Sequence, residues 1–153
     1  MECKEKHEKM RVYLDNCCYN RPYDEQGQLR VRLETEAKLE VQARMRSGEL
    51  EYIWSDMLLT EAMDNPDEDR REKILSWCLN ATVFVHTTPE VRTNAELLME
   101  YGVKSADAIH IASAAMAKCD WFLTVDKGIL KKINHVGTMR IANPMEYIQE
   151  EMP

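Results

Sequence analysis

Three acidic residues lie where the sequence predicts the end of a strand or the beginning of a helix, and a fourth lies inside a helix that follows a strand. The three are Asp15, Asp107 and Asp126, and the fourth is Glu61. Carboxylates gathered in one crevice raise one another's pKa, so they cannot all stay ionised without a cation. Hard divalent ions take oxygen ligands and keep bound water for chemistry. The four acids therefore predict a site for Mg²⁺ or Mn²⁺, provided that the fold brings them together.

The elements around these acids alternate between strands and helices. Strands are predicted at Arg11–Asp15, Glu51–Trp54, Thr82–Val85, Trp121–Val125 and Met139–Ile141. Helices are predicted at Leu29–Ser47, Asp56–Met63, Pro66–Leu79, Pro89–Tyr101, Ser105–Lys118 and Lys127–Lys132, and residues 16–27 are predicted as turns. This alternation indicates an α/β fold, a three-layer sandwich around a mostly parallel sheet of about four to five strands.

Such a sheet places the four acids at one edge, because ligands bind outside the carboxyl ends of parallel strands. Asp15 and Asp126 each end a strand. A helix that leads into a strand runs antiparallel to it, so Asp107 at the start of its helix faces the same edge. Glu61 lies about six residues, or roughly 9 Å, beyond the start of its helix, at the limit of what a Glu side chain can reach back over to that edge. We therefore expect all four carboxylates to face one crevice.

Each acid taken singly also has a purely structural explanation. Asp107 complements the positive end of its helix dipole, with Ser105 as the cap. Asp126 caps the following helix, Asp15 opens an Asx-turn, and Glu61 is solvated. Only the joint placement of the four favours a site.

Composition limits the class of protein. A chain of 153 residues suits one domain that buries roughly two thirds of its extended-chain surface. Hydrophobic residues at 44% and charged residues at 31% are typical of a soluble globular protein, and no apolar run is long enough to span a membrane. Residues 1–9 are mixed in charge and are expected to form a flexible tail before a single domain at 10–150.

Charge and cysteine content add two further constraints. The net charge of −7 argues against broad electrostatic binding of nucleic acid, so any such role must rest on a local site. The five cysteines are an odd number and include no Cys-x-x-Cys pair, which argues against disulfides and zinc. A cytoplasmic location is expected.

The helix predicted at Leu29–Ser47 has an unusual pattern. Its apolar residues alternate with polar ones as in a strand, but its length and its many Glu, Lys, Arg and Ala residues favour a helix. On a helix these apolar positions spread round the whole circumference. Either the helix packs between the sheet and another helix, or a partner chain covers its outer face.

The acids and their neighbours resemble the PIN-domain family of metal-dependent nucleases. The resemblance runs through most of the chain and includes Leu14-Asp15, Ser55 with Glu61, Asp107-Ala108, Thr124-Val125-Asp126 and Ile141-Ala-Asn-Pro-Met-Glu-Tyr-Ile148. It implies a PIN-like domain at 10–150. It also implies that Asp15, Asp107 and Asp126 hold one or two Mg²⁺ or Mn²⁺ ions, with Glu61 as a further ligand or as the base that orients the water.

The resemblance also implies what the site acts on. Thr124, Lys127, Arg21 and Arg92 are candidates to contact substrate or neighbouring phosphates. Many small relatives in this family are ribonuclease toxins of toxin-antitoxin pairs, which implies an RNA substrate and an antitoxin partner. A homo-oligomer is expected, with Leu29–Ser47 or the adjoining helix at the interface. The alternative is a catalytically silent PIN-like module that binds other proteins.

The chain departs from the family pattern after the first acid. The family commonly has a small hydroxyl residue two positions after that Asp, whereas this chain has Asn16-Cys17-Cys18. Either Asn16 or Tyr19 is expected to fill that supporting role, or activity is reduced. Cys17 and Cys18 are interpreted as small buried residues. His110 is interpreted as a hydrogen-bonded core histidine in preference to a metal ligand.

Overall fold

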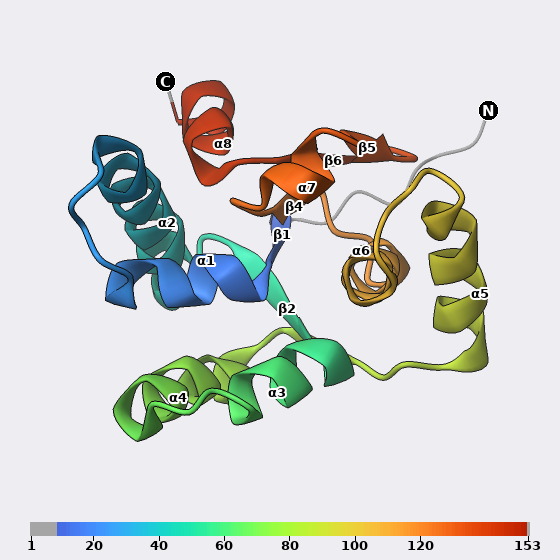
Figure 1. Ribbon diagram of the computed structural model, residues 1–153, viewed down its shortest axis with the longest axis horizontal. Helices are drawn as coiled ribbons and strands as arrows, with labels where there is room; N and C mark the ends of the chain where they lie inside the picture. Colours follow the sequence, from blue (N-terminus) through green and yellow to red (C-terminus); the bar gives the residue numbers. More distant parts are fainter. Residues whose placement is uncertain (1–8, 153) are drawn as a thin grey trace.

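The computed structural model describes residues 9–152, which form a six-stranded sheet in the order β3-β2-β1-β4-β6-β5 (Figure 1). The strands are β1 (Arg11–Leu14), β2 (Glu51–Ser55), β3 (Val83–Val85), β4 (Trp121–Leu123), β5 (His135–Val136) and β6 (Met139–Ala142). Neighbours in this sheet are parallel except β5 and β6. The predicted fold class is confirmed, but the strand count was too low, because a strand as short as β5 leaves no readable alternation.

Helices cover both faces of this sheet and give three layers (Figure 1). In one outer layer α6 (Ser105–Met116) packs on β2 and β3, with α5 (Pro89–Met99) outside it; in the other, α8 (Pro144–Glu151) packs on β4 and on α2 (Leu29–Ser47). The remaining helical segments are α1 (Asn16–Asn20), α3 (Asp56–Met63), α4 (Glu68–Leu75), α7 (Lys127–Leu130) and the 3₁₀ turns η1 (Arg21–Tyr23) and η2 (Ser76–Asn80).

The segment after β1 corrects one prediction. Of the predicted turn segment 16–27, residues 16–23 are helical, as α1 and η1. The Asp15 side chain caps α1 by accepting from the Asn16 backbone N–H, and Cys18 and Tyr19 are buried against the core. Pro22 falls in the first turn of η1, where its missing N–H costs nothing. Burial of one face overrides the local turn signals.

The helix ends differ from the predicted ones for local reasons. The helix predicted at Pro66–Leu79 begins at Glu68 after the Asp67 cap, and the 3₁₀ turn η2 replaces its last part. The predicted ends at Tyr101 and Lys118 lie beyond the last residues of α5 and α6. Lys118 has a φ of 56°, a left-handed conformation that ends helices.

The helix α2 presents polar residues to the protein and leucines to solvent. Its buried residues are Glu34, Thr35, Lys38, Val41, Gln42 and Met45. Leu29, Leu33 and Leu39 are exposed, Leu29 by 62%. The inward face packs on α8 and η1, so another helix covers it, whereas no close packing on a strand of the sheet is found among the described residues. Cover of the outer face by a partner chain stays a prediction.

The core is one cluster that runs through both layers and the sheet. Tyr13 of β1 stacks on Phe122 of β4, with 5.2 Å between ring centroids. No helix within residues 9–152 is long and apolar enough to cross a membrane. Most of the tail expected at 1–9 lies outside the described residues.

Candidate functional site

Asp15 is the most buried of the four predicted acids and is 5% exposed. It follows the last residue of β1, at the carboxyl edge of the sheet. Its Oδ1 accepts from the Asn16 backbone N–H at 2.8 Å, and its Oδ2 accepts from Thr124 Oγ1 at 2.8 Å. Two hydrogen bonds to different oxygens hold the carboxylate in one orientation. Asp15 is therefore a rigidly placed carboxylate.

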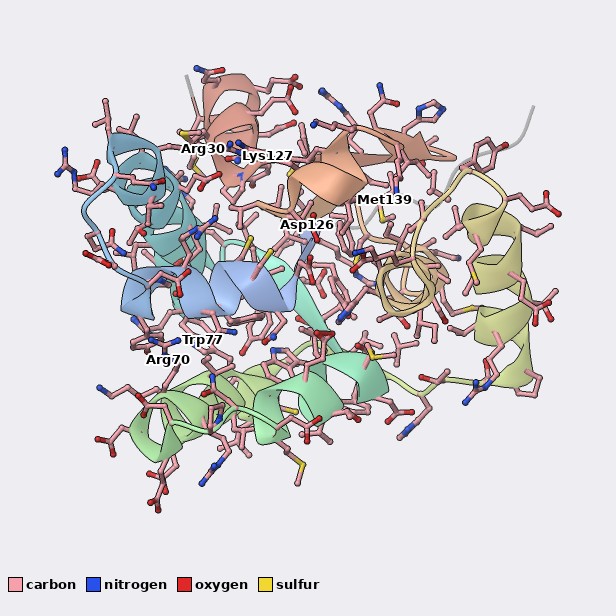
Figure 2. All side chains as sticks on the ribbon, viewed as in Figure 1. Arg30, Arg70, Trp77, Asp126, Lys127 and Met139 are labelled. Carbon is pink, nitrogen blue, oxygen red and sulfur yellow. The ribbon has the colours of Figure 1, made fainter. Side chains whose placement is uncertain are left out.

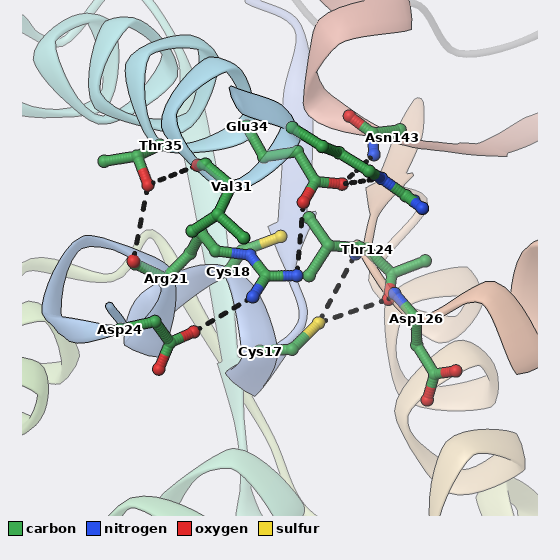
Figure 3. Close-up of polar contacts among 12 residues, drawn as sticks. Cys17, Cys18, Arg21, Asp24, Val31, Glu34, Thr35, Thr124, Asp126 and Asn143 are labelled. Carbon is green, nitrogen blue, oxygen red and sulfur yellow. Dashed lines mark hydrogen bonds and ion pairs between the residues drawn. The ribbon is translucent and has the colours of Figure 1, made fainter. Parts of the chain in front are cut away.

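Cys17 supplies a third contact to this carboxylate. Its Sγ donates to Asp15 Oδ2 at 3.4 Å and lies 3.3 Å from Thr124 Oγ1, as Figure 3 shows for the thiol and the threonine. A hydrogen bond with the Cys18 side chain raises the pKa of the Cys17 thiol, and burial and the charge of Asp15 raise it further. The thiol therefore stays protonated at neutral pH and remains a donor.

This arrangement corrects the expectation that Asn16 or Tyr19 fills the supporting role. Asn16 supplies only its backbone N–H to Asp15, and the Tyr19 hydroxyl accepts from Trp54 Nε1 at 3.0 Å. The first turn of α1 instead directs the Cys17 side chain back over the residue that caps the helix. A thiol thus occupies the position where the family commonly has a hydroxyl.

Thr124 joins the loops that carry Asp15 and Asp126. Its Oγ1 donates to Asp15 and accepts from the Asp126 backbone N–H at 3.1 Å. The Asp126 carboxylate caps α7 by accepting from the Gly128 N–H at 2.7 Å. A Cβ on residue 128 would lie 3.0 Å from Asp126 Oδ1, so this carboxylate rests closely on the glycine backbone.

Asp107 lies in the first turn of α6 and shares a small pocket with Asp126. Burial raises the pKa of the Asp107 carboxyl, and the charges of Asp15, Asp126 and Glu61 raise it further. The predicted Ser105 cap is wrong: Lys104 is the N-cap residue, and Ser105 is the first residue of the helix. The causes of the raised Asp107 pKa show that the charges of all three other acids act on this carboxyl group.

Glu61 of α3 is hydrogen-bonded to the buried imidazole of His110. His110 Nε2 contacts Glu61 Oε1 and lies 3.8 Å from Asp15 Oδ1, while Nδ1 lies 2.6 Å from the Tyr13 hydroxyl. Burial lowers the pKa of His110, but its hydrogen bond with Glu61 and the charges of Asp15 and Asp107 outweigh burial and raise it overall. His110 is the hydrogen-bonded core residue that was expected, and it lies between two of the predicted acids.

These residues suit a hard divalent cation by their chemistry. The donors are carboxylate oxygens. Burial, and then the charges of the other three acids, raise the pKa of Asp107, and a cation relieves the part that comes from those charges. Asp15, Asp107 and Asp126 would hold such an ion, with Glu61 beside them. Within residues 9–152, however, no group of three or more His, Cys, Asp or Glu side chains has the spacing of a complete metal-binding set. The four acids lie at one edge of the sheet, and the charges of the other three act on Asp107, but the side chains as described do not form a complete set of metal ligands.

The residues expected to contact substrate lie in different surroundings. Lys127 is exposed at the first position of α7, next to Asp126 (Figure 2), and Arg92 is exposed on α5. Thr124 is fully buried. The Arg21 guanidinium pairs with Asp24 at 3.1 Å and with Glu34 at 3.2 Å, so two carboxylates already engage it (Figure 3).

Three-layer packing with acids at the carboxyl edge of a parallel sheet defines a class of α/β proteins with a polar site at that edge. The PIN-domain family model matches residues 28–136, most of the sequence, and the chain belongs to this family. The match includes Glu61, Asp107 and Asp126 and begins after Asp15.

The fold is shared with solved structures. One of them is VapBC2 from Rickettsia felis bound to a DNA fragment from their promoter, which matches with a TM-score of 0.56 at 10% identity over 88% of this chain and 98% of that chain. Among curated proteins, none matches this sequence. Similarity at this identity establishes the shared architecture.

Two residues that touch the site were missing from the sequence-based site. Tyr13 was assigned only to a strand, and Cys17 only to small buried residues. A usable signal existed for Tyr13, because residues two apart on a strand point to the same face, which places Tyr13 beside Asp15. The role of Cys17 depended on recognising α1 as a helix.

Proposed function

We propose that this protein is an endoribonuclease that depends on Mg²⁺ or Mn²⁺ and hydrolyses phosphodiester bonds. The observation that carries the proposal is the placement of Asp15, Glu61, Asp107 and Asp126 at one sheet edge, where burial, and then the charges of the other three acids, raise the pKa of Asp107. Membership of the PIN-domain family, whose members are generally nucleases, supports the same chemistry.

Each acid has a distinct part in this scheme. A divalent ion bound there lowers the pKa of its water and neutralises charge on the phosphate under attack. Asp15 would be the most rigidly held ligand, because Thr124 and Cys17 fix its orientation. Asp107 and Asp126, which line one small pocket, would supply further carboxylate ligands. Glu61, hydrogen-bonded to His110, would orient the attacking water.

The first test is neutralisation of single acids. Asp15→Asn and Asp107→Asn keep the size of the side chain and remove its charge, so we expect cleavage to fall by at least about 100-fold. Asp64→Asn, on the exposed C-cap of α3, is the matched control and is expected to leave the rate unchanged. Cleavage of a labelled RNA is measured in Mn²⁺ and in chelator, with circular dichroism to check folding. Full activity in either site variant rejects the proposal.

A silent interaction module is the second candidate, and the leucines exposed on α2 favour it. Such a module would neither bind Mn²⁺ nor cleave RNA. Calorimetric titration with Mn²⁺ distinguishes the two, because the nuclease is expected to bind the ion and the module is not.

Partners and location are part of the proposal. The fold match to VapBC2, a complex bound to DNA of its own promoter, supports an antitoxin as a partner. The exposed leucines of α2 support self-association or antitoxin binding through that helix. The free thiols of Cys17, Cys18, Cys78 and Cys119 suit a reducing cytoplasm.

A further inference from the structure

A chain of buried polar groups runs behind the four acids. The Tyr13 hydroxyl lies 2.7 Å from Ser55 Oγ and 2.6 Å from His110 Nδ1, and His110 Nε2 contacts Glu61. Tyr13 and Ser55 are fully buried, and His110 is 1% exposed. Such a chain requires strict geometry, because every buried polar group needs its partner.

The chain connects the same elements that carry three of the acids. Tyr13 lies two residues before Asp15, so both side chains leave β1 on the same face. His110 lies three residues after Asp107, so both share one face of α6. Ser55 caps α3 by accepting from the Leu58 N–H at 3.2 Å, and the same helix carries Glu61.

Because each hydrogen bond in the chain joins two of these elements, the chain fixes the separation of the acids. The bond from Tyr13 to Ser55 sets the start of α3 against β1. The bond from Tyr13 to His110 sets α6 against β1, and the contact from His110 to Glu61 closes the triangle between α6 and α3.

We propose that Ser55, Tyr13 and His110 are positioning residues that set the spacing of Asp15, Asp107 and Glu61 and so determine the affinity for the divalent ion. This inference rests on the proposed function. It concerns binding of the ion more than the chemical step, because none of the three residues is required to contact the substrate.

The test removes one hydroxyl group from this chain of hydrogen-bonded side chains. Tyr13→Phe keeps the ring that stacks on Phe122 and deletes the hydroxyl that joins Ser55 to His110. Tyr19→Phe is the matched control, because it also removes a buried hydroxyl, one that bonds Trp54 and none of the acids. Mn²⁺ affinity of the RNA-free protein is measured by calorimetry and by electron paramagnetic resonance.

We expect Tyr13→Phe to raise the Kd for Mn²⁺ by about tenfold, as loss of one hydrogen bond near charged groups implies. Saturating Mn²⁺ should restore kcat to within about threefold of the wild type, and Tyr19→Phe should keep the wild-type Kd within about twofold. Wild-type affinity in Tyr13→Phe overturns the inference, and so does an equal loss in both tyrosine variants.

Two further outcomes separate this inference from the proposed function. If the folded wild-type protein binds no Mn²⁺, the proposed function fails, and the positioning role fails with it. If Tyr13→Phe does not fold, His110→Gln decides, because it removes the link between Tyr13 and Glu61 from the other end. A wild-type Mn²⁺ affinity in His110→Gln overturns the positioning role.

Discussion

The thiol of Cys17 shows how one residue type replaces another at a supporting position. A thiol is a weaker hydrogen-bond donor than a hydroxyl, but its larger sulfur atom reaches Asp15 and Thr124 together at 3.4 and 3.3 Å. Its raised pKa keeps the proton on sulfur, so no second negative charge forms beside Asp15. The departure from the family pattern therefore preserves the direction of the hydrogen bond.

Substitution of Cys17 measures what this contact contributes. Cys17→Ser restores a stronger donor and is expected to keep or raise kcat/KM for RNA cleavage. Cys17→Ala leaves Asp15 one donor short and is expected to lower it by about fivefold, in line with one weak hydrogen bond. Initial rates at fixed Mn²⁺ are compared, with Cys78→Ala, far along the chain at η2, as the control. Equal rates in Cys17→Ala and the wild type would show that the thiol only fills space.

At the same scale, Asp15, Asp107 and Asp126 could be chosen from the sequence because each stands next to a recognisable strand or helix terminus. Glu61 could be chosen because its helix directly follows a strand. The groups that hold them could not be found in the same way. Thr124 and Asp15 are separated by 109 positions, and Tyr13 and His110 by 97, so no local pattern connects them. Only the parallel register of β1 with β4 brings Leu14 beside Leu123, and with them the residues that follow.

Among the elements, α2 shows most clearly where local patterns stop being informative. Its buried Glu34 accepts from Asn143 Nδ2 at 2.6 Å and from Arg30 Nε at 3.3 Å, and pairs with Arg21. Asn143 also caps α8, so this carboxylate ties α2 to η1 and to the start of α8. Composition and length predicted the helix at Leu29–Ser47, and the alternating apolar pattern predicted that it lacks a single apolar stripe. Neither predicted that polar residues face inward.

Lys38 is a charged residue on the inward face of α2, and it is 2% exposed. Desolvation lowers the pKa of Lys38 from 10.5 to about 7, with its ammonium 5.9 Å from the Tyr19 ring centroid. Below pH 7 both the native and the unfolded chain carry this proton, and the native state bears the full cost of a buried charge. Between pH 7 and 10.5 the unfolded state binds more protons, so this contribution to stability rises with pH.

Replacement of the lysine should therefore stabilise the protein. Lys38→Met keeps the length of the side chain without the charge, and we expect the free energy of unfolding to rise by on the order of 2 kcal/mol at pH 6. The gain should shrink as the pH approaches 10. Urea unfolding of both proteins between pH 6 and 10 measures it, and Arg32→Met on the exposed face of α2 serves as the control. A gain that does not change with pH would contradict the proposed cost of charge burial.

For the whole molecule, the balance of charge constrains how a polyanion can be held. The chain has 20 Lys and Arg against 27 Asp and Glu, and many of its arginines are engaged by carboxylates. Near the predicted acids, Lys127 is exposed, whereas Arg21 is engaged by Asp24 and Glu34. Binding of RNA should therefore depend on the divalent ion and a few local cations, as the sequence-based argument from net charge requires.

Because few exposed cations lie near the acids, we expect RNA cleavage to depend only weakly on the concentration of monovalent salt. With Mn²⁺ held saturating, the slope of log kcat/KM against log KCl concentration is expected to be about −1 to −2, which corresponds to two or three neutralised phosphates. Lys127→Gln should make the slope shallower by about one, because it removes one phosphate contact. Lys131→Gln, also exposed and just beyond the end of α7, should leave it unchanged. A slope of about −4 or steeper would require a long basic track away from the acids, and the substrate would then be held by a surface other than this edge of the sheet.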